Sequence, residues 1–406
     1  MRIAIFTNTY LPTQNGVAIS TANLREGLIK LGHEPFVFAP LVVGTDSKDE
    51  KNIFRYPAFN VRSIANYPIA LPISPEISKV LKEAKFDLVH TEHPWWVGEW
   101  GLDYARKSNL PIITTVHTRY DIYAKLIPLP QELLISTLKN KLEEYLGSVD
   151  LITTPGGGSK ERLLKESVKT PIEVVSNPTD LSDFWSAKAD KIRKKFGLKS
   201  GDILIGYVGR LSEEKNIQTL LATVEIILKN KPNVKMVLIG DGPDREELEK
   251  RASEISKDRI IFTGNVPHKE IPFYDAALDT FVSASKSEIQ PMTFAEAMAT
   301  GTPIVVFDVA GCNDMVQDKE NGRLVATKEG SKGLAQAVID LISDKDELSD
   351  MGKRAKKWAT RYEQENATRD MLKAYKLAIS LHKKTSRASE GHQQLKIKNC
   401  KLKIRR

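Results

Sequence analysis

Apolar, β-branched runs alternate with amphipathic stretches through the first 180 residues of the chain. The runs are apolar on both faces, as strands of a parallel sheet are when helices cover both sides. They lie at Ile3–Thr7, Pro35–Ala39, Asp87–Thr91, Pro111–Val116, Leu151–Thr154 and Ile172–Ser176. The stretches between them have the helical period, at Val17–Lys30, Val97–Lys107, Gln131–Tyr145 and Lys160–Glu166. This alternation predicts an α/β fold with a doubly wound parallel sheet.

The alternation restarts after a polar, basic segment, Ser186–Ser200, which we interpret as a linker. Further strands are expected at Ile203–Val208, Val234–Ile239, Ile260–Phe262, Thr280–Ser283 and Pro303–Phe307. Further helices are expected at Ile217–Leu228, Pro243–Ile255, Phe294–Ala299 and Leu334–Ile342, followed by one long charged helix from about Leu348 to Leu381. Two Rossmann-like domains that face a cleft are the simplest architecture for this pattern.

The amino-acid composition agrees with two folded domains and excludes several other classes of protein. The chain has 406 residues, of which 41% are apolar and 28% charged; these values exclude a globally disordered or fibrous chain. Two cysteines cannot supply a disulfide framework and indicate a reducing compartment. No apolar stretch reaches the roughly 18 residues of a membrane span, and the start lacks the pattern of a signal peptide. We therefore expect a cytoplasmic protein.

The net charge of +8 is confined to the end of the chain. Residues 383–406 contain nine Lys or Arg and one Glu, which leaves residues 1–382 formally neutral. The basic balance therefore does not indicate a nucleic-acid surface on the folded domains, and we expect no nucleic-acid partner. The tail itself is expected to be disordered. It is either an extension without function or a segment attracted to an anionic membrane.

Polar loops after strands carry the candidate chemistry, because open parallel sheets bind ligands beyond the carboxyl ends of their strands. The first such loop enters a helix at Asn15-Gly16, where a phosphate or sugar can approach the backbone; an ordinary capped turn is the alternative. In the second half, Arg210 and Lys215 flank a loop that opens a helix. Cations are unfavourable there unless an anion such as a diphosphate compensates them, and solvated charges are the alternative.

Two carboxylates frame another junction between a loop and a helix. Glu288 lies in the loop, and Glu296, eight positions later, lies one turn into the helix. Carboxylates are good acceptors for the vicinal hydroxyls of a sugar or ribose, and the helix-start amides between them suit an anion. The alternative is that Glu296 only stabilises the helix N-terminus.

The segment SKSEIQPMTFAEAMATGTPIVV resembles the E-x7-E segment of the retaining GT-B glycosyltransferases of family 4. Other motifs follow in the family's order: Asn15-Gly16-Val17, Thr115-Val116-His117-Thr118, Gly209-Arg210, Glu214-Lys215-Asn216, Ile239-Gly240-Asp241-Gly242-Pro243 and Phe262-Thr263-Gly264. The match runs from residue 1 to about 380. It implies an acceptor-side domain at 1–180, a nucleotide-sugar-binding domain at 181–350, a helix at 351–382 that returns to the first domain, and a tail at 383–406.

The resemblance also implies roles for individual residues. Arg210 and Lys215 would hold the donor diphosphate and stabilise its departing charge, Glu288 would bind the donor sugar, and His117 would lie beside the reacting sugar. Glu296 would bind the ribose, and residues near Val266 would meet the base through main-chain groups. The remaining contacts to donor or acceptor would come from Asn15, Gly16, Met292 and Thr293.

No metal and no other cofactor is expected. Retention in this family is explained by attack on the same face as the leaving diphosphate, which helps to take the acceptor proton. The segment His90-Thr91-Glu92-His93 lacks the H-E-x-x-H spacing of a metal site and is interpreted as a loop that faces the acceptor. Two segments depart from the family pattern: Ile289-Gln290-Pro291 replaces glycines of the E-x7-E segment, and Asn177-Pro178-Thr179-Asp180 replaces N-G-[IV]-D.

Within the family, S-K-S-E-x-Q and the stretch T-x-H-T-x-Y-x-x-Y from Thr115 are most similar to bacterial diacylglycerol glucosyltransferases. This similarity implies a UDP- or GDP-hexose donor, with UDP-glucose favoured, and a lipid acceptor. Segment Ala124–Tyr145 mixes apolar residues with lysines, as an interfacial surface or an ordinary amphipathic helix does. The alternatives are transfer to a soluble or polysaccharide acceptor and a nucleotide-sugar epimerase of the same fold. A dinucleotide-binding module would need G-x-G-x-x-G after the first strand, which is missing.

Overall fold

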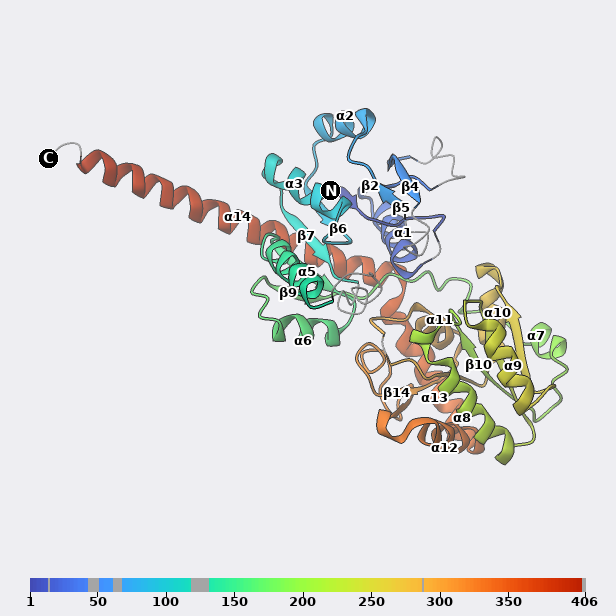
Figure 1. Cartoon of the computed structure of the whole chain (residues 1–406). Helices are drawn as coiled ribbons and strands as arrows, with labels where there is room; N and C mark the ends of the chain where they lie inside the picture. Colours follow the sequence, from blue (N-terminus) through green and yellow to red (C-terminus); the bar gives the residue numbers. More distant parts are fainter. Residues whose placement is uncertain (14, 43–50, 61–67, 118–130, 287, 404–406) are drawn as a thin grey trace. The chain divides into compact units, whose positions relative to one another are not determined.

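The computed structural model describes residues 1–13, 15–42, 51–60, 68–117, 131–286 and 288–403 (Figure 1). It divides the chain into two units. Unit 1 comprises Met1–Pro155, Lys160–Val175 and Thr368–Arg406, and unit 2 comprises Gly156–Ser159 and Ser176–Ala367. The main passage of the chain into unit 2, at Ser176, lies just before residue 180, where the sequence predicts the change of domain.

Unit 1 is built on a seven-stranded sheet with the order β3-β2-β1-β6-β7-β8-β9, and every pairing is parallel. Its strands are β1 (Arg2–Phe6), β2 (Glu34–Pro40), β3 (Ile53–Tyr56), β6 (Leu88–Thr91), β7 (Ile112–Thr115), β8 (Leu151–Thr154) and β9 (Ile172–Val174). The connecting helices are α1 (Gly16–Lys30), α2 (Pro75–Glu83), α3 (Val97–Ser108), α5 (Gln131–Leu146) and α6 (Gly157–Lys165). β4 (Ala58–Asn60) and β5 (Pro68–Ala70) form a separate antiparallel pair.

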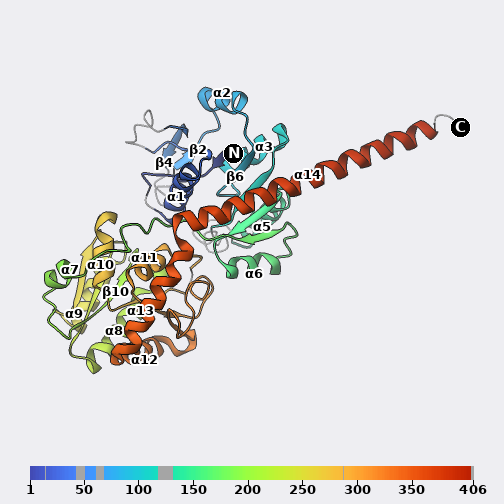
Figure 2. The ribbon, with the colours of Figure 1, turned by 180° about the vertical axis from the view of Figure 1, so that it is seen from behind.

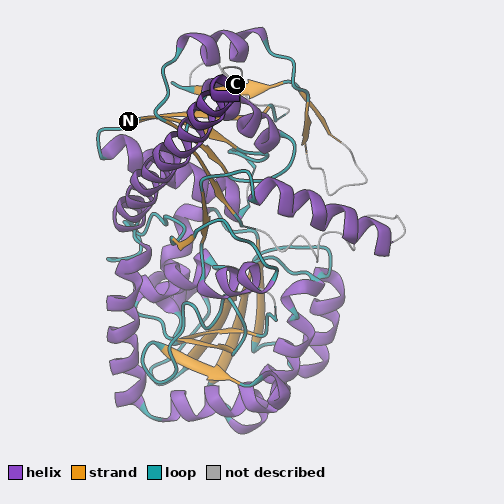
Figure 3. Ribbon diagram, turned by 90° about the vertical axis from the view of Figure 1, so that its left-hand side faces the viewer, coloured by secondary structure: helices purple, strands orange, loops and turns teal. Residues whose placement is uncertain are grey.

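Unit 2 repeats this construction with a six-stranded parallel sheet in the order β12-β11-β10-β13-β14-β15. Its strands are β10 (Ile203–Val208), β11 (Val234–Ile239), β12 (Ile260–Gly264), β13 (Thr280–Ser283), β14 (Ile304–Phe307) and β15 (Gly322–Val325). Its helices are α7 (Asp190–Lys195), α8 (Ile217–Asn230), α9 (Arg245–Ile255), α10 (Ile271–Ala277), α11 (Met292–Thr300), α12 (Gly330–Ser343) and α13 (Lys345–Ala359). Figure 3 shows strands flanked by helices. The expected α/β fold with doubly wound parallel sheets is confirmed.

The strand order places a switch point in each sheet. The chain leaves β1 for β2 and β3 on one side and later returns to β6 on the other side. In unit 2 it leaves β10 for β11 and β12 and returns to β13. Adjacent connections diverge at such a point, and the carboxyl ends of the two central strands then border a crevice that binds ligands. The loops after β1, β6, β10 and β13 are therefore the places to look for a site.

Two predicted elements differ in the structure. The supposed linker Ser186–Ser200 contains α7, because Ile192 is buried in the unit 2 core and Phe196 and Leu198 pack against it. The single long helix expected from Leu348 is broken after α13 by a 3₁₀ turn and by Glu363, whose backbone is extended (φ −58°, ψ 139°). This extended residue forms a parallel bridge with Thr179, so the helical hydrogen bonds cannot continue through it.

The last helix, α14 (Gln364–Lys403), packs on unit 1 and continues into the supposed tail (Figure 2). Met371, Ala374, Tyr375 and Ala378 are buried in the core of unit 1. The tail was expected to be disordered from residue 383, but the structure has helix as far as Lys403. The segment contains no proline and many Lys, Leu and Gln residues, which favour helix, and this local preference explains the difference.

Gly27 of α1 tests how α14 packs. A β-carbon on Gly27 would overlap the hydroxyl of Thr368 in α14, whereas one on Gly16 of the same helix would meet open space. We expect Gly27→Ala to lower the free energy of unfolding by about 1–3 kcal/mol through overpacking. Chemical denaturation measures the effect, with Gly16→Ala as the matched control. Equal stability of the two variants would contradict the packing of α14 against α1.

Candidate active site

The site in unit 2 gathers at the carboxyl ends of β10 and β13. Lys215 ends the 3₁₀ helix Glu213–Lys215 after β10, and Glu288 lies in the loop after β13. Lys215 Nζ donates to Glu288 Oε1 at 2.7 Å, and their side chains are only 25% and 10% exposed. An ion pair this shielded from water is stronger than a surface pair. Two residues that the sequence placed in separate motifs therefore form one charged unit.

Asn216 holds the Lys215 loop in place. Its backbone is left-handed (φ 55°) where it starts α8, and its Nδ2 donates to the carbonyl of Ala284 at 2.9 Å. Its Oδ1 accepts from Thr219 Oγ1 at 2.8 Å. The end of β13 and the start of α8 are thus fixed to each other. The Glu214-Lys215-Asn216 motif combines a cation with the residue that positions its loop.

The loop that carries Glu288 is supported from two sides. Gly311 has a φ of 84°, and any side chain there would collide with the carbonyl of Glu288. Gln290 is 9% exposed, and its Oε1 accepts from the backbone amide of Asn177 at 2.6 Å. The two segments that depart from the family pattern are therefore in contact, through Gln290 and Asn177. This hydrogen bond fixes a backbone that glycines would leave more free.

Helix α11 presents its N-terminus beside Glu288. Pro291 caps it with an extended backbone and no side-chain hydrogen bond, and the amide of Phe294 donates to the Pro291 carbonyl. Amides in the first turn of a helix have no carbonyl acceptor within the helix and attract anions. Met292 and Thr293 occupy this turn and are half-buried. The position suits a phosphate or a sugar hydroxyl.

Glu296, further along α11, is 5% exposed and pairs with His268, whose Nε2 lies 3.1 Å from Glu296 Oε1. Asp275 of α10 is fully buried beside Glu296, and within the described part of the chain neither of its carboxyl oxygens has a hydrogen-bond partner. Burial, followed by the charge of Glu296, raises the pKa of Asp275 well above its usual range. The protonated, neutral form of Asp275 is therefore favoured.

Two further predicted residues flank this site. Arg210 is exposed, its carbonyl accepts from the Tyr207 hydroxyl at 3.0 Å, and among the described residues its side chain has no ion-pair partner. Its guanidinium is thus available to an anion. Val266 follows β12 and packs, partly buried, against the core of unit 2. Its backbone lies just before His268.

In unit 1, Asn15 acts as a helix cap. Its Oδ1 accepts from the amide of Ala18 at 2.9 Å, and its Nδ2 donates to Thr9 Oγ1 at 2.9 Å. Gly16 begins α1, and a β-carbon there would meet nothing within 4 Å. The capping interpretation therefore accounts for Asn15. The open space at Gly16 leaves its backbone accessible.

His117, after β7, contacts a carboxylate that the sequence analysis did not assign to the site. Its Nε2 lies 2.6 Å from Glu92 Oε2, and both side chains are nearly buried. Burial acts to raise the pKa of Glu92, but His90, His117 and His93 outweigh it and lower the pKa to about 2. Burial lowers the pKa of His93 to about 3. A carboxylate directly after an apolar strand was the signal available in the sequence.

Within the ranges that the structure describes, no group of three or more His, Cys, Asp or Glu side chains is arranged to hold a metal ion. The same ranges contain no helix that is long and apolar enough to cross a bilayer.

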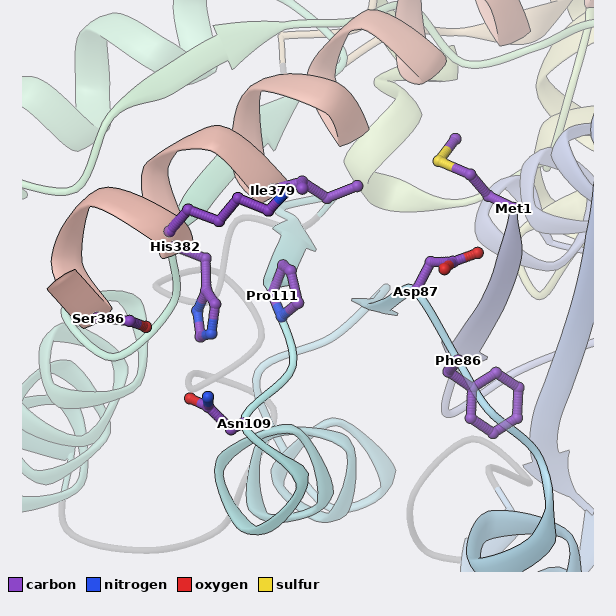
Figure 4. Close-up of a pocket in the computed structure, with 9 residues that line it drawn as sticks. Met1, Phe86, Asp87, Asn109, Pro111, Ile379, His382 and Ser386 are labelled. Carbon is purple, nitrogen blue, oxygen red and sulfur yellow. The ribbon is translucent and has the colours of Figure 1, made fainter.

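A cavity of about 680 Å³ lies at the other edge of the unit 1 sheet (Figure 4). Met1, Asp87 and Pro111 line it, and they precede β1, β6 and β7. His382 and Ser386 of α14 complete its wall. The cavity is therefore at the amino ends of the strands, whereas His117 and Glu92 follow the carboxyl ends. It is not part of the candidate active site.

Comparison with known proteins identifies the family. Residues 14–183 match the model described as Glycosyltransferase Family 4, and residues 188–358 match that of Glycosyl transferases group 1. The alpha-monoglucosyldiacylglycerol synthase of Streptococcus pneumoniae is 30% identical over 348 residues, which are 84% of this chain and 78% of that protein. The chain belongs to the family 4 glycosyltransferases. The resemblance inferred from the sequence motifs is thereby confirmed.

Other relatives of this glycosyltransferase differ in their named donors. A GDP-mannose-dependent alpha-mannosyltransferase of Mycobacterium tuberculosis is 25% identical over 85% of this chain and 89% of that protein. Among solved structures, sucrose-phosphate synthase from Thermosynechococcus elongatus has a TM-score of 0.75 at 20% identity, covering 93% and 99% of the two chains. These structural likenesses confirm the GT-B fold, and the relatives establish a hexosyltransferase rather than an epimerase or a dinucleotide-binding module.

The pairing of His268 with Glu296 has a measurable consequence. Hydrogen bonding to Glu296 raises the pKa of His268 above 6.5, and Asp180 and Asp183 act in the same direction against burial. We expect Glu296→Gln to lower this pKa toward 6.5, because the charge that stabilises the imidazolium is lost. NMR titration of the His268 ring measures it. The pair stabilises the fold below pH 6.5, and this contribution disappears as the pH rises through the raised pKa.

The matched control is Glu329→Gln, an exposed carboxylate of the same unit. A His268 pKa that stays unchanged in Glu296→Gln would show that the two side chains do not pair in solution.

Proposed function

We propose that this glycosyltransferase is a retaining enzyme that moves glucose from UDP-glucose to a hydroxyl of a membrane lipid such as diacylglycerol. The observation that carries the proposal is the shielded Lys215–Glu288 pair at the switch point of unit 2. It places a cation for a leaving diphosphate next to an acceptor for sugar hydroxyls. The preference for glucose and a lipid rests on the named relatives from Streptococcus pneumoniae and Acholeplasma laidlawii.

In this proposal the bound donor takes the place of ion pairs and hydrogen bonds that side chains of the protein otherwise make with each other. Lys215 and Arg210 bind the diphosphate, joined by the first-turn amides of Met292 and Thr293. Glu288 accepts hydroxyls of the sugar, and Glu296 exchanges His268 for the ribose. The base lies against the backbone near Val266. Each exchange trades one charge-assisted hydrogen bond for another, so the charged groups are positioned before the donor arrives.

The transfer step follows from these positions. The bond between the anomeric carbon and the diphosphate oxygen breaks, and the acceptor oxygen forms its bond on the same face of the sugar. The acceptor proton passes to the departing phosphate oxygen. Negative charge grows on the diphosphate, where Lys215 and Arg210 stabilise it. Asn15, Gly16 and His117 are proposed to contact the acceptor or the reacting sugar, and no metal or other cofactor takes part.

A GDP-hexose donor is the second candidate, because GDP-mannose-dependent mannosyltransferases are also among the relatives. A soluble or polysaccharide acceptor is the corresponding alternative on the acceptor side. A screen of UDP-glucose and GDP-mannose against diacylglycerol in liposomes and simple sugars separates these outcomes by nucleotide release and product mass. Release with UDP-glucose and diacylglycerol, unchanged by EDTA, supports the proposal. Transfer from GDP-mannose alone, or activity that only added Mg²⁺ or Mn²⁺ restores, contradicts it.

The leaving-group role of Lys215 predicts a specific loss. We expect Lys215→Ala to lower kcat on the order of 100-fold, as when one donor that stabilises a transition state is removed. The control is Lys229→Ala, since Lys229 is exposed and, within the described ranges, pairs with Glu225 on its own helix. Steady-state kinetics of the folded variants measures the effect. Turnover equal to wild type in Lys215→Ala would remove Lys215 from the proposed mechanism.

We further propose that the protein binds the cytoplasmic face of an anionic membrane through the end of α14. Residues 383–406 hold the whole excess of positive charge, and each lysine near such a surface contributes about 1 kcal/mol. The segment Ala124–Tyr145, a second candidate surface, lies partly outside the described residues.

Truncation after Ser386 keeps the part of α14 that packs on unit 1, and we expect it to reduce co-sedimentation with anionic liposomes at low salt. Transfer to a soluble acceptor should be retained. Equal binding by both chains would exclude this membrane role for the tail.

A further inference from the structure

Glu92 is the centre of a buried polar cluster at the carboxyl ends of β6 and β7. Its Oε2 lies 2.6 Å from His117 Nε2, and its Oε1 lies 3.8 Å from His90 Nε2. Glu92 is 2% exposed and His90 is fully buried. A carboxylate removed from water to this extent is strongly destabilised unless donors surround it. The cluster is therefore held together by the need to satisfy one buried charge.

The hydrogen-bond partners of His90 show that it is fixed from both ends. Its Nδ1 lies 2.9 Å from the hydroxyl of Tyr375 in α14, and its Nε2 lies 2.7 Å from Thr115 Oγ1. Thr115 in turn lies 2.7 Å from Thr153 Oγ1 of β8. These hydroxyls occupy both ring nitrogens of His90. His117 is consequently the histidine with the shorter and more direct contact to Glu92.

The short contact determines which nitrogen of His117 carries a proton. A carboxylate that is ionised can only accept, so His117 Nε2 must be the donor. In a neutral imidazole with a proton on Nε2, Nδ1 is unprotonated and acts as an acceptor. When its ring is neutral, His117 can therefore accept a hydrogen bond through Nδ1 but cannot donate one there.

We propose that Glu92 is a positioning residue that holds His117 as the Nε2–H tautomer, so that Nδ1 accepts a hydrogen bond from a hydroxyl of the substrate sugar. This inference rests on the proposed function for the identity of that hydroxyl, but the tautomer itself does not depend on it. A histidine in the other tautomer would present an N–H to the sugar, and the hydroxyl would then have to accept. The direction of one hydrogen bond to the substrate is thus set by a carboxylate that does not touch the substrate.

The tautomer is observable without any substrate. In protein labelled with ¹⁵N at histidine, long-range proton–nitrogen correlation distinguishes a protonated ring nitrogen from an unprotonated one. We expect the neutral ring of His117 in the wild-type protein to have a protonated Nε2 and an unprotonated Nδ1, with assignment from the spectrum of His117→Gln. A neutral ring with its proton on Nδ1, or a ring protonated on both nitrogens under the conditions of the transfer assay, would overturn the inference.

Glu92→Gln tests the link to catalysis while keeping the size of the side chain. The amide can accept from Nε2–H or donate to an unprotonated Nε2, so both tautomers become possible and we expect a mixture in the same spectrum. We expect kcat to fall about 10- to 100-fold with a smaller change in KM, the loss seen when the partner that orients a metal-bound histidine is removed. A single Nε2–H tautomer in Glu92→Gln would overturn the positioning role.

The matched control is Glu99→Gln, which makes the same substitution at an exposed position on α3 of the same unit. It should leave both the spectrum and kcat unchanged. If the wild-type tautomer is as expected but no donor and acceptor pair supports transfer, the proposed function fails and the positioning of His117 stands. If transfer occurs but Glu92→Gln has wild-type kcat, the inference fails and the proposed function stands.

Discussion

Parallel pairing of the central strands is the constraint on which the rest of this molecule depends. β1 lies between β2 and β6, and β10 lies between β11 and β13, and all four pairings are parallel. Parallel strands point their carboxyl ends in one direction and need helical crossovers on both faces. The loops after the central strands therefore meet at the carboxyl edge of each sheet, where they can bring polar side chains together. The positions of Lys215, Glu288, Glu92 and His117 follow from that arrangement.

Each carboxylate of the candidate site has a cationic or imidazole partner. Glu288 pairs with Lys215, Glu296 with His268, and Glu92 with His117. Burying an unpaired carboxylate is costly, so the partners permit these side chains to be shielded. Asp275 has no such partner among the described residues, and burial raises its pKa, which favours the neutral acid. The paired carboxylates therefore differ from Asp275 in how the cost of burial is met.

The sequence predicted the strands best where burial is uniform. β10, β11 and β13 have the predicted bounds, because each is a short apolar run with clear polar ends. β3, β4, β5, β15, α2 and α10 were missed. β3 has only four residues, two of them half-buried, and gives a weak signal. α2 is short and has one buried residue, Ile77, and its amphipathic pattern was overlooked.

The sequence predicted which residues belong to the candidate site better than it predicted which of them contact each other. Glycines, cations and carboxylates after strands identified Arg210, Lys215, Glu288 and Glu296, because loop chemistry is local in the sequence. The contact of Lys215 with Glu288 joins residues 73 apart, and no local pattern encodes that distance. Glu92 was seen as part of a loop but not as the partner of His117 for the same reason. The extended backbone at Glu363 depends on a bridge to Thr179, which is also a long-range property.

Gly311 shows that a close contact between two loops can depend on a small residue in either loop. The family pattern given above has glycines inside the E-x7-E segment; here Ile289-Gln290-Pro291 lacks them, and a glycine lies in the neighbouring loop, against the Glu288 carbonyl. The path of the backbone at Glu288 and the residue allowed at 311 are therefore coupled. A larger residue in one of these loops can be accommodated only where the other loop leaves space for it. A sequence motif that covers only the E-x7-E segment therefore leaves out Gly311, a residue after the next strand on which the packing of that segment depends.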